Sequence, residues 1–332
     1  MRITRDLLLN IAENTAKEKA TGDPSIVGVY LYGSVLEGSE PLLGGTADID
    51  LVCIHENYDR QREIIRLTED VTLDIEHHDK ASYQPPKELR LQPELGSMAF
   101  SAKPLHDPEH FIDFVQAAVR GMFWEHDNVL MRTSRLLQDA RRAWLRFHNS
   151  PLEFSPEQVA SYLQALEDSA NAVVCLTGMP QGDRRFLLEF PARAEAVGQP
   201  GLYPGLLGLI GGGIEIAEAV PDWLPDWDAD FMTINLGYEV PPALHKHRQA
   251  YYRRSFKDLL EGEHPEAVLW PFLRTWTEMA LTMPSQAQSW RAVCEELGLI
   301  GAGFEGRLDG LDAYLDRLEE LLEGWDTQGE EY

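Results

Sequence analysis

Asp48-Ile49-Asp50-Leu51, which begins fourteen residues after the end of Tyr32-Gly33-Ser34, is the stretch of sequence that decides the fold. The run that leads into Gly33, residues 26–32 (IVGVYLY), is rich in β-forming residues and predicts a strand. Residues 49–54 predict a second strand after a glycine turn. Because successive side chains of a strand point to opposite faces, Asp48 and Asp50 should share one face while Ile49 and Leu51 point into the core.

A third acid lies on the next predicted strand, residues 71–76, where Asp74 is flanked by Leu73 and Ile75. If this strand neighbours the second one, three carboxylates crowd one patch. Such a patch of hard oxygen ligands is typical of Mg²⁺ sites that also hold substrate phosphates, and it suits two ions. Glu76 lies on the same face as Asp74, so it is the alternative third ligand.

Gly33-Ser34 has the residues for a phosphate site. Glycine lets the backbone approach a phosphate closely, and we expect a helix to start after it. The N–H groups of that helix start, together with the Ser34 hydroxyl, would bind an anion. Gly33 and Ser34 are therefore the candidate nucleotide-binding residues.

These elements together resemble the polymerase-β-like nucleotidyltransferase superfamily, and within it the aminoglycoside nucleotidyltransferases of the kanamycin type. The resemblance covers roughly residues 25–120 and includes the acid at Asp74 and the region 104–107. The loop between Ser34 and Asp48 is longer than is common in the family. The resemblance rests on six motif residues: Tyr32, Gly33, Ser34, Asp48, Ile49 and Asp50.

The resemblance implies an enzyme that uses Mg²⁺ and a nucleoside triphosphate, with ATP favoured, and that contacts the phosphates through Gly33 and Ser34. It also implies that Asp48, Asp50 and Asp74 are catalytic metal ligands. Some members take a general base from the helical domain, for which Glu167 is the candidate here; a solvated helix acid is the alternative interpretation. Members also form dimers, so a homodimer is expected.

The expected fold is an α/β nucleotidyltransferase domain over residues 1–120, with a small mixed sheet flanked by helices, followed by an all-α substrate-binding domain over residues 121–332. In the first part we expect a helix over 3–20, helical character over 56–66, an edge strand over 98–103, a turn over 104–108 and a helix over 109–119. In the second part, loops are expected at 220–225 and at Pro241-Pro242. The amphipathic stretches there predict helices over 130–147, 156–177, 243–260, 268–281 and 308–325.

Composition limits the partners and the location. Lysine and arginine total 29 against 55 acids, a formal net charge of −26, which disfavours nucleic-acid substrates and favours a cationic acceptor. The same acid excess could also serve solubility alone. No stretch approaches the ~18 consecutive apolar residues of a membrane span, and the start lacks the apolar region of a signal peptide, so a cytoplasmic protein is expected. Cys53, Cys175 and Cys294 are expected to be reduced core thiols.

The sequence thus favours transfer of a nucleoside monophosphate to a hydroxyl of a small acceptor, with an aminoglycoside-like polycation as the favoured acceptor. Two alternatives stay open: transfer to a protein or tRNA, as in toxin–antitoxin systems, and an inactive nucleotide-binding protein. The histidine pairs in His77-His78-Asp79 and His245-Lys246-His247 lack a partner set of metal ligands in the sequence and are not interpreted as metal sites.

Overall fold

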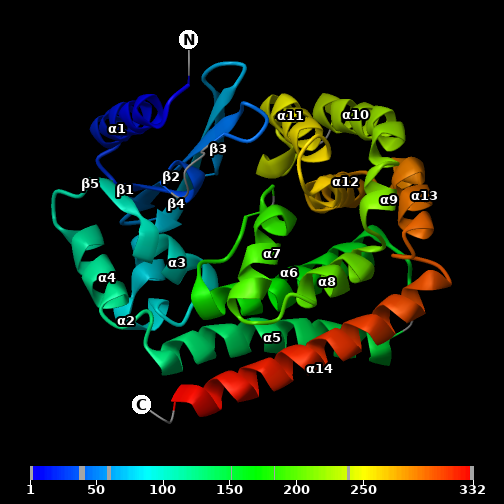
Figure 1. The fold of residues 1–332 in the computed structure, drawn as a ribbon. Coiled ribbons are helices and arrows are strands. Elements are labelled where there is room, and N and C mark those ends of the chain that lie inside the picture. The colour runs from blue at the N-terminus through cyan, green and yellow to red at the C-terminus, as the bar shows by residue number, and fades with distance from the viewer. Residues whose placement is uncertain are drawn as a thin grey trace. The chain divides into compact units, whose positions relative to one another are not determined.

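The computed structural model describes residues 3–36, 42–57, 61–150, 152–182, 184–237 and 240–329 (Figure 1). The chain divides into two compact units, Met1–Asn128 and Val129–Tyr332. The boundary between them lies eight residues after the one that the sequence predicts, at residue 120. The first unit holds a small mixed sheet with helices, and the second is helical, which confirms the expected fold class.

The sheet of the first unit has five strands in the order β3-β4-β2-β1-β5. The central pair, β2 and β4, is parallel, and the other three pairs are antiparallel. Both central strands are almost wholly buried, as strands with neighbours on both sides usually are. The strands are β1 (Ile26–Tyr32), β2 (Ala47–His55), β3 (Glu63–Arg66), β4 (Val71–Asp79) and β5 (Lys103–His106).

Helix α1 (Arg5–Gly22) packs on one face of this sheet and confirms the helix predicted over residues 3–20. Thr4 caps it, because its hydroxyl accepts a hydrogen bond of 3.3 Å from the backbone N–H of Leu7. The buried residues of α1 contact the alternate residues of β2 that include Ile49 and Leu51. Burial of this face fixes the register of β2, since a shift of β2 by one residue would place its acids in the core.

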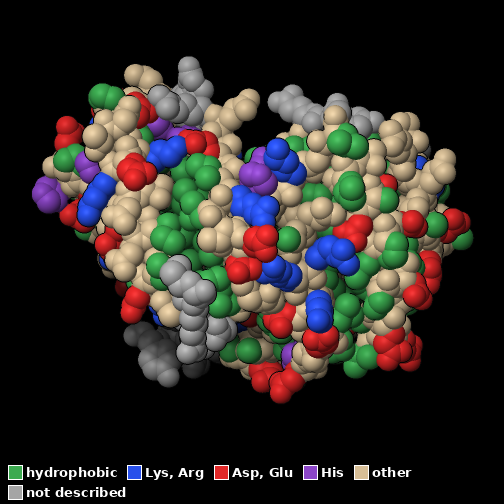
Figure 2. All heavy atoms as spheres, turned by 90° about the horizontal axis from the view of Figure 1, so that it is seen from above, with side chains coloured by type: hydrophobic (Ala, Val, Ile, Leu, Met, Phe, Trp, Pro, Cys, Tyr) green, Lys and Arg blue, Asp and Glu red, His purple; other side chains and the backbone are tan. Residues whose placement is uncertain are grey.

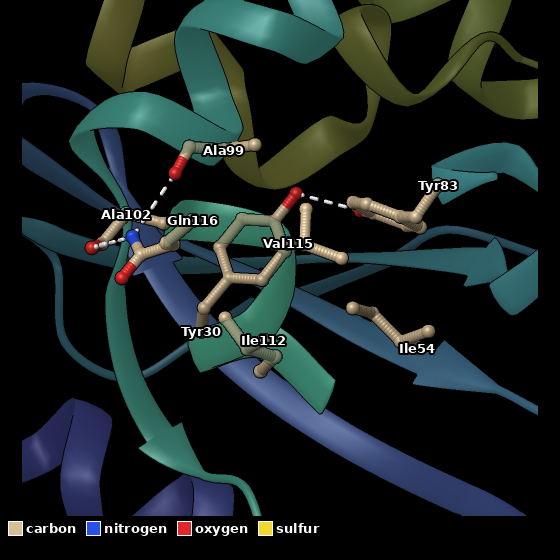
Figure 3. Close-up of a pocket in the computed structure, with 8 residues that line it drawn as sticks. All are labelled: Tyr30, Ile54, Tyr83, Ala99, Ala102, Ile112, Val115 and Gln116. Atoms are coloured by element: carbon tan, nitrogen blue, oxygen red, sulfur yellow. Dashed lines mark hydrogen bonds between the residues drawn. The ribbon is translucent and has the colours of Figure 1, made fainter. Parts of the chain in front are cut away.

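Two helices of the first unit cover part of the opposite face of the sheet. Helices α3 (Pro93–Ser101) and α4 (Phe111–Arg120) lie over the half that carries Tyr30 and Ile54, where they enclose a small apolar cavity (Figure 3). The side chain of Gln116 ties α4 to the backbone carbonyls of Ala99 and Ala102, at 3.0 and 2.7 Å. The other half of this face carries the acids of β2 and β4.

Two predictions for the first unit are wrong. Residues 63–66, expected to be helical, form β3, because they pair with β4 and satisfy its backbone groups along that edge. Residues 98–101, expected in an edge strand, complete α3, which starts with Pro93 in its first turn. The edge strand β5 begins only at Lys103 and includes residues 104–106 of the turn predicted over 104–108. Helix α4 confirms the helix predicted over 109–119.

The second unit is helical, as predicted, but the helix predicted over 243–260 begins only at Gln249, after 3₁₀ turns over residues 242–244 and 246–248. Residues 220–225, expected to be a loop, instead begin α10, since Pro221 lies in the first turn, where its missing N–H has no partner to lose. Pro242 begins a short 3₁₀ turn, Pro242–Leu244. The helices are α5 (His126–Asn149), which starts in the first unit, α6 (Pro156–Thr177), α7 (Phe186–Ala196), α8 (Leu202–Ile210), α9 (Ile214–Ala217), α10 (Val220–Gly237), α11 (Gln249–Leu260), α12 (Leu269–Thr282), α13 (Gln288–Glu296) and α14 (Gly303–Gly329).

Large aromatic and leucine side chains form the core of the second unit. On α14, which confirms the helix predicted over 308–325, four leucines are buried: Leu311, Leu315, Leu318 and Leu322. The three cysteines are buried free thiols, as predicted. Among the described residues, no helix combines the length and apolar character that a membrane crossing requires. Four tryptophans are fully buried: Trp227, Trp270, Trp276 and Trp290.

Candidate metal site

The register between the two central strands brings the three predicted acids together. β2 and β4 run in parallel, and the pairing sets Asp50 directly opposite Asp74 and Asp48 opposite Thr72. Each of the three acids offers a carboxylate oxygen, and these oxygens all lie within 4.8 Å of one another. In the described parts of the chain, this is the one group of three or more acids, histidines or cysteines with metal-site spacing.

Burial makes this cluster costly without a counter-charge. Only 4% of the surface of Asp48 and 1% of that of Asp74 is exposed, and Asp50 is half-buried. Carboxylates this close repel one another, and removal from water weakens the solvation that would offset the repulsion. The donor set therefore fits a divalent cation with a preference for hard oxygen ligands.

Gly33 lies directly against the cluster. Its φ of +76° is in the left-handed region, and a Cβ at this position would lie 2.5 Å from Oδ2 of Asp50. The preceding residue, Tyr32, pairs with Asp50 across β1 and β2. The position therefore requires glycine for two independent reasons, backbone conformation and the space taken by a carboxylate.

The segment after Gly33 differs from the predicted helix start. Residues Gly33–Val35 form a single 3₁₀ turn that closes with a 2.9 Å hydrogen bond from the N–H of Leu36 to the carbonyl of Gly33. Ser34 is half-buried in this turn, at the end of the strand that borders the acids. Residues 37–41 lie outside the described residues, so the phosphate role of Gly33 and Ser34 stays a prediction.

Arg62 is the residue of this site that the sequence did not reveal. Its guanidinium donates two hydrogen bonds to Asp74, from Nε to Oδ1 at 2.6 Å and from Nη2 to Oδ2 at 2.8 Å, and Nη1 lies 2.9 Å from Oε1 of Glu76. Burial alone would lower the pKa of Arg62, but the hydrogen bond and charge of Asp74 and the charge of Glu76 raise it above its usual value. Arg62 directly precedes β3, in the segment predicted to be helical, so no local pattern marked it.

Glu76, the alternative third ligand, is held by other partners. Besides Arg62, the Tyr32 hydroxyl donates to Oε1 at 2.9 Å, and Nε2 of His78 lies 3.0 Å from Oε2. Burial raises the pKa of Glu76, while the hydrogen bond of His78, the charge of Arg62 and the hydrogen bond of Tyr32 outweigh it and lower this pKa. Glu76 is therefore an ionised anchor beside the three-acid group rather than a member of it.

A chain of hydrogen bonds continues from Glu76 to the cavity on the same face of the sheet. Nδ1 of His78 lies 2.7 Å from the hydroxyl of Tyr83, and this hydroxyl lies 2.8 Å from that of Tyr30 (Figure 3). Burial raises the pKa of Tyr30 and of Tyr83, so both hydroxyls stay protonated. His78 thus orients Glu76 within a hydrogen-bonded network.

The other histidine of the His77-His78-Asp79 segment points to the opposite face. Nδ1 of His77 lies 2.8 Å from Nε2 of His55, and its Nε2 lies 3.0 Å from Oε1 of Glu63. His245 and His247 stack edge to face in the second unit, with ring centroids 4.6 Å apart. His77, His78, His245 and His247 thus all contact neighbouring side chains.

Glu167, the candidate general base, is on α6 in the second unit. Its side chain is 17% exposed, and Oε2 lies 3.4 Å from Nη2 of Arg274 on α12. The interpretation as a solvated helix acid does not describe this half-buried ion pair. Glu167 is not one of the three clustered acids, and its catalytic role stays a prediction.

Comparison with known proteins adds a likeness to solved structures. Neither the models of known protein families nor the curated proteins give a match to this sequence. Among solved structures, the chain is similar to a nucleotidyltransferase-like protein from Exiguobacterium sibiricum 255-15, with 12% sequence identity and a TM-score of 0.31 over 94% of this chain and 91% of the other.

Proposed function

We propose that this chain is a Mg²⁺-dependent nucleotidyltransferase that moves a nucleoside monophosphate from a nucleoside triphosphate, with ATP favoured, to a hydroxyl group of a small acceptor. The convergence of Asp48, Asp50 and Asp74 within 4.8 Å carries this proposal. Gly33 supports it, because a backbone without a side chain lies against the cluster where a phosphate would have to approach.

The three carboxylates would hold the metal ions, and two ions are expected. Mg²⁺ bound there would lower the pKa of the attacking hydroxyl and neutralise the charge of the triphosphate. The residues fit this ion because their donors are all anionic oxygens on two rigid, hydrogen-bonded strands. Strand placement matters, since ligands on regular elements keep their geometry better than ligands on loops.

The chain's own residues account for the remaining needs of the reaction. The acceptor oxygen forms a bond to the α-phosphorus, the bond from this phosphorus to the bridging oxygen breaks, and pyrophosphate leaves. The proposed role of Gly33 and Ser34 is to hold the phosphates in line for this attack. The acceptor proton passes to a base, for which Glu167 is the proposed residue.

The proposed acceptor is a small cationic compound of the aminoglycoside kind. The net charge of −26 supports this choice, because it attracts polycations and repels nucleic acids. Acidic side chains are spread over the face shown in Figure 2 rather than gathered in one patch. A cytoplasmic location and a homodimer belong to the same proposal.

The test is a transfer assay with the full chain, Mg²⁺, labelled nucleoside triphosphates and a panel of amines and sugars. Labelled small products that disappear in Asp50→Asn, but not in the surface control Asp113→Asn on α4, would support the proposal. Label on protein or tRNA alone would replace the small acceptor with a macromolecule. Nucleotide binding without any transfer would instead identify an inactive nucleotide-binding protein.

A further inference from the structure

Arg62 binds the carboxylate of Asp74, the third acid of the proposed metal site. Both oxygens of Asp74 receive a hydrogen bond from its guanidinium, at 2.6 and 2.8 Å. Asp74 is 1% exposed, so this is a contact with a buried carboxylate, whereas the Arg62 side chain is 37% exposed. Paired N–H groups on one carboxylate form the strongest kind of side-chain hydrogen bond, and they set the position of the acid.

The same contact opposes metal binding at Asp74. A guanidinium carries a permanent positive charge, and a divalent cation on Asp74 would lie within a few ångströms of it. Without a cation, Arg62 brings a positive charge to Asp74, which offsets part of the repulsion among the three acids. Once a cation supplies that charge, the guanidinium at Asp74 becomes unfavourable.

Glu76 offers Arg62 a second, fixed partner. Its Oε1 lies 2.9 Å from Nη1 of Arg62, and the carboxylate is held in place by Tyr32 at 2.9 Å and His78 at 3.0 Å. Arg62 can therefore leave Asp74 while it keeps its contact with Glu76. Its partial exposure leaves the guanidinium room to move toward solvent.

We infer that Arg62 is a positioning residue that exchanges with a divalent cation on Asp74: it holds the carboxylate in the metal-free protein and moves onto Glu76 when the cation binds. This inference rests on the proposed function, because it assumes that Asp74 is a metal ligand. It assigns Glu76 the role of receiving the displaced arginine.

The first experiment measures Mn²⁺ affinity of the full chain by calorimetry or electron paramagnetic resonance, with no nucleotide present. Arg62→Gln removes the competing charge, and we expect it to bind Mn²⁺ about tenfold more tightly, because no positive charge within a few ångströms then opposes the ion. Arg62→Lys keeps the charge and should stay near the parent. The matched control is Arg66→Gln on β3, whose side chain is 45% exposed and lies 3.5 Å from Glu69; its affinity should not change.

Equal or weaker Mn²⁺ binding by Arg62→Gln would overturn the exchange. Asp50→Asn separates the two proposals: if the parent binds no Mn²⁺, or if Asp50→Asn binds it as the parent does, the metal site itself is refuted. If Asp50→Asn loses Mn²⁺ while Arg62→Gln matches the parent, only the role of Arg62 is refuted.

A second experiment follows Arg62 in the parent protein by NMR and uses Arg62→Lys only to assign the resonance. The Nε–H resonance of Arg62 in the ¹⁵N-labelled parent, assigned by its loss in Arg62→Lys, should shift when Mg²⁺ is added, because the 2.6 Å hydrogen bond to Asp74 breaks. An Arg62 resonance that does not move at a Mg²⁺ concentration that saturates the site would contradict the inference.

Discussion

Gly33 and Asp50 are in contact across two strands, so that a Cβ on Gly33 would lie 2.5 Å from Oδ2 of the aspartate. Gly33 thus turns the chain at the end of β1 and leaves space for the carboxylate of Asp50. The contact links the two halves of the sequence motif in the folded protein.

Gly33→Ala is expected to displace the carboxylate of Asp50 and to weaken divalent-cation binding. The left-handed φ of +76° adds a backbone penalty of roughly 1–2 kcal/mol in the free energy of unfolding. Gly45→Ala is the matched control, because Gly45 has a similar φ of +70° and no atom within 4 Å of the added Cβ. Thermal unfolding should show destabilisation of both variants, larger for Gly33→Ala, and Mn²⁺ titration should show a lower affinity only for Gly33→Ala; an affinity there equal to that of the parent would refute the steric argument.

Glu167→Gln should lower turnover about 10²–10⁴-fold if Glu167 is the general base. Its Mn²⁺ affinity should match that of the parent, because Glu167 is not one of the clustered acids. Arg274→Gln is the control, since it removes the partner 3.4 Å away but leaves the carboxylate in place. If Glu167→Gln turns over at the parental rate, Glu167 is not the general base, and its ion pair with Arg274 is structural.

Stability should fall in acid through Glu63. Burial raises the pKa of Glu63, but hydrogen bonds and charges from Lys19 and His77 outweigh burial and lower it below the ordinary value of 4.5. A carboxyl whose pKa is lower in the folded than in the unfolded state stabilises the fold above the unfolded pKa. This contribution is lost as the pH falls through the folded pKa. Urea unfolding between neutral pH and pH ~3 should show a smaller loss in Glu63→Gln than in the parent.

The control for that experiment is Glu69→Gln, which alters a carboxyl with a 79% exposed side chain in the turn after β3. Its pH profile should follow that of the parent. Identical profiles for the parent, Glu69→Gln and Glu63→Gln would assign the acid sensitivity to other groups.

The three cysteines should resist thiol reagents in the native protein. All are buried, and burial raises the pKa of Cys175 to about 12, so little of the reactive thiolate is present. Labelling followed by mass spectrometry should be slow without denaturant and complete in it. Cys53 reports on the first unit, and Cys175 and Cys294 report on the second. Rapid modification of any of them under native conditions would contradict the burial.

Much of the fold could be predicted because it depends on local patterns. Alternation along β2 sets Asp48 and Asp50 on one face, since the side-chain period of a strand is a property of its backbone. The long helices of the second unit follow in the same way from the spacing of their apolar residues. Misleading local signals account for the errors. Residues 63–66 begin and end with a charged residue, Glu63 and Arg66, and none of them is fully buried, because β3 is an edge strand. Residues 98–100 are apolar because α3 packs on the sheet.

The sequence by itself determined that Asp48 and Asp50 share a face, that Asp74 lies on a strand, and that a glycine ends β1. Only the tertiary structure decided that Asp74 lies opposite Asp50, that Glu76 is held by Tyr32 and His78, and that Arg62 reaches Asp74. The physical reason is that side-chain direction follows from the geometry of a single strand, whereas register and ion pairing depend on which strands become neighbours when the core is buried.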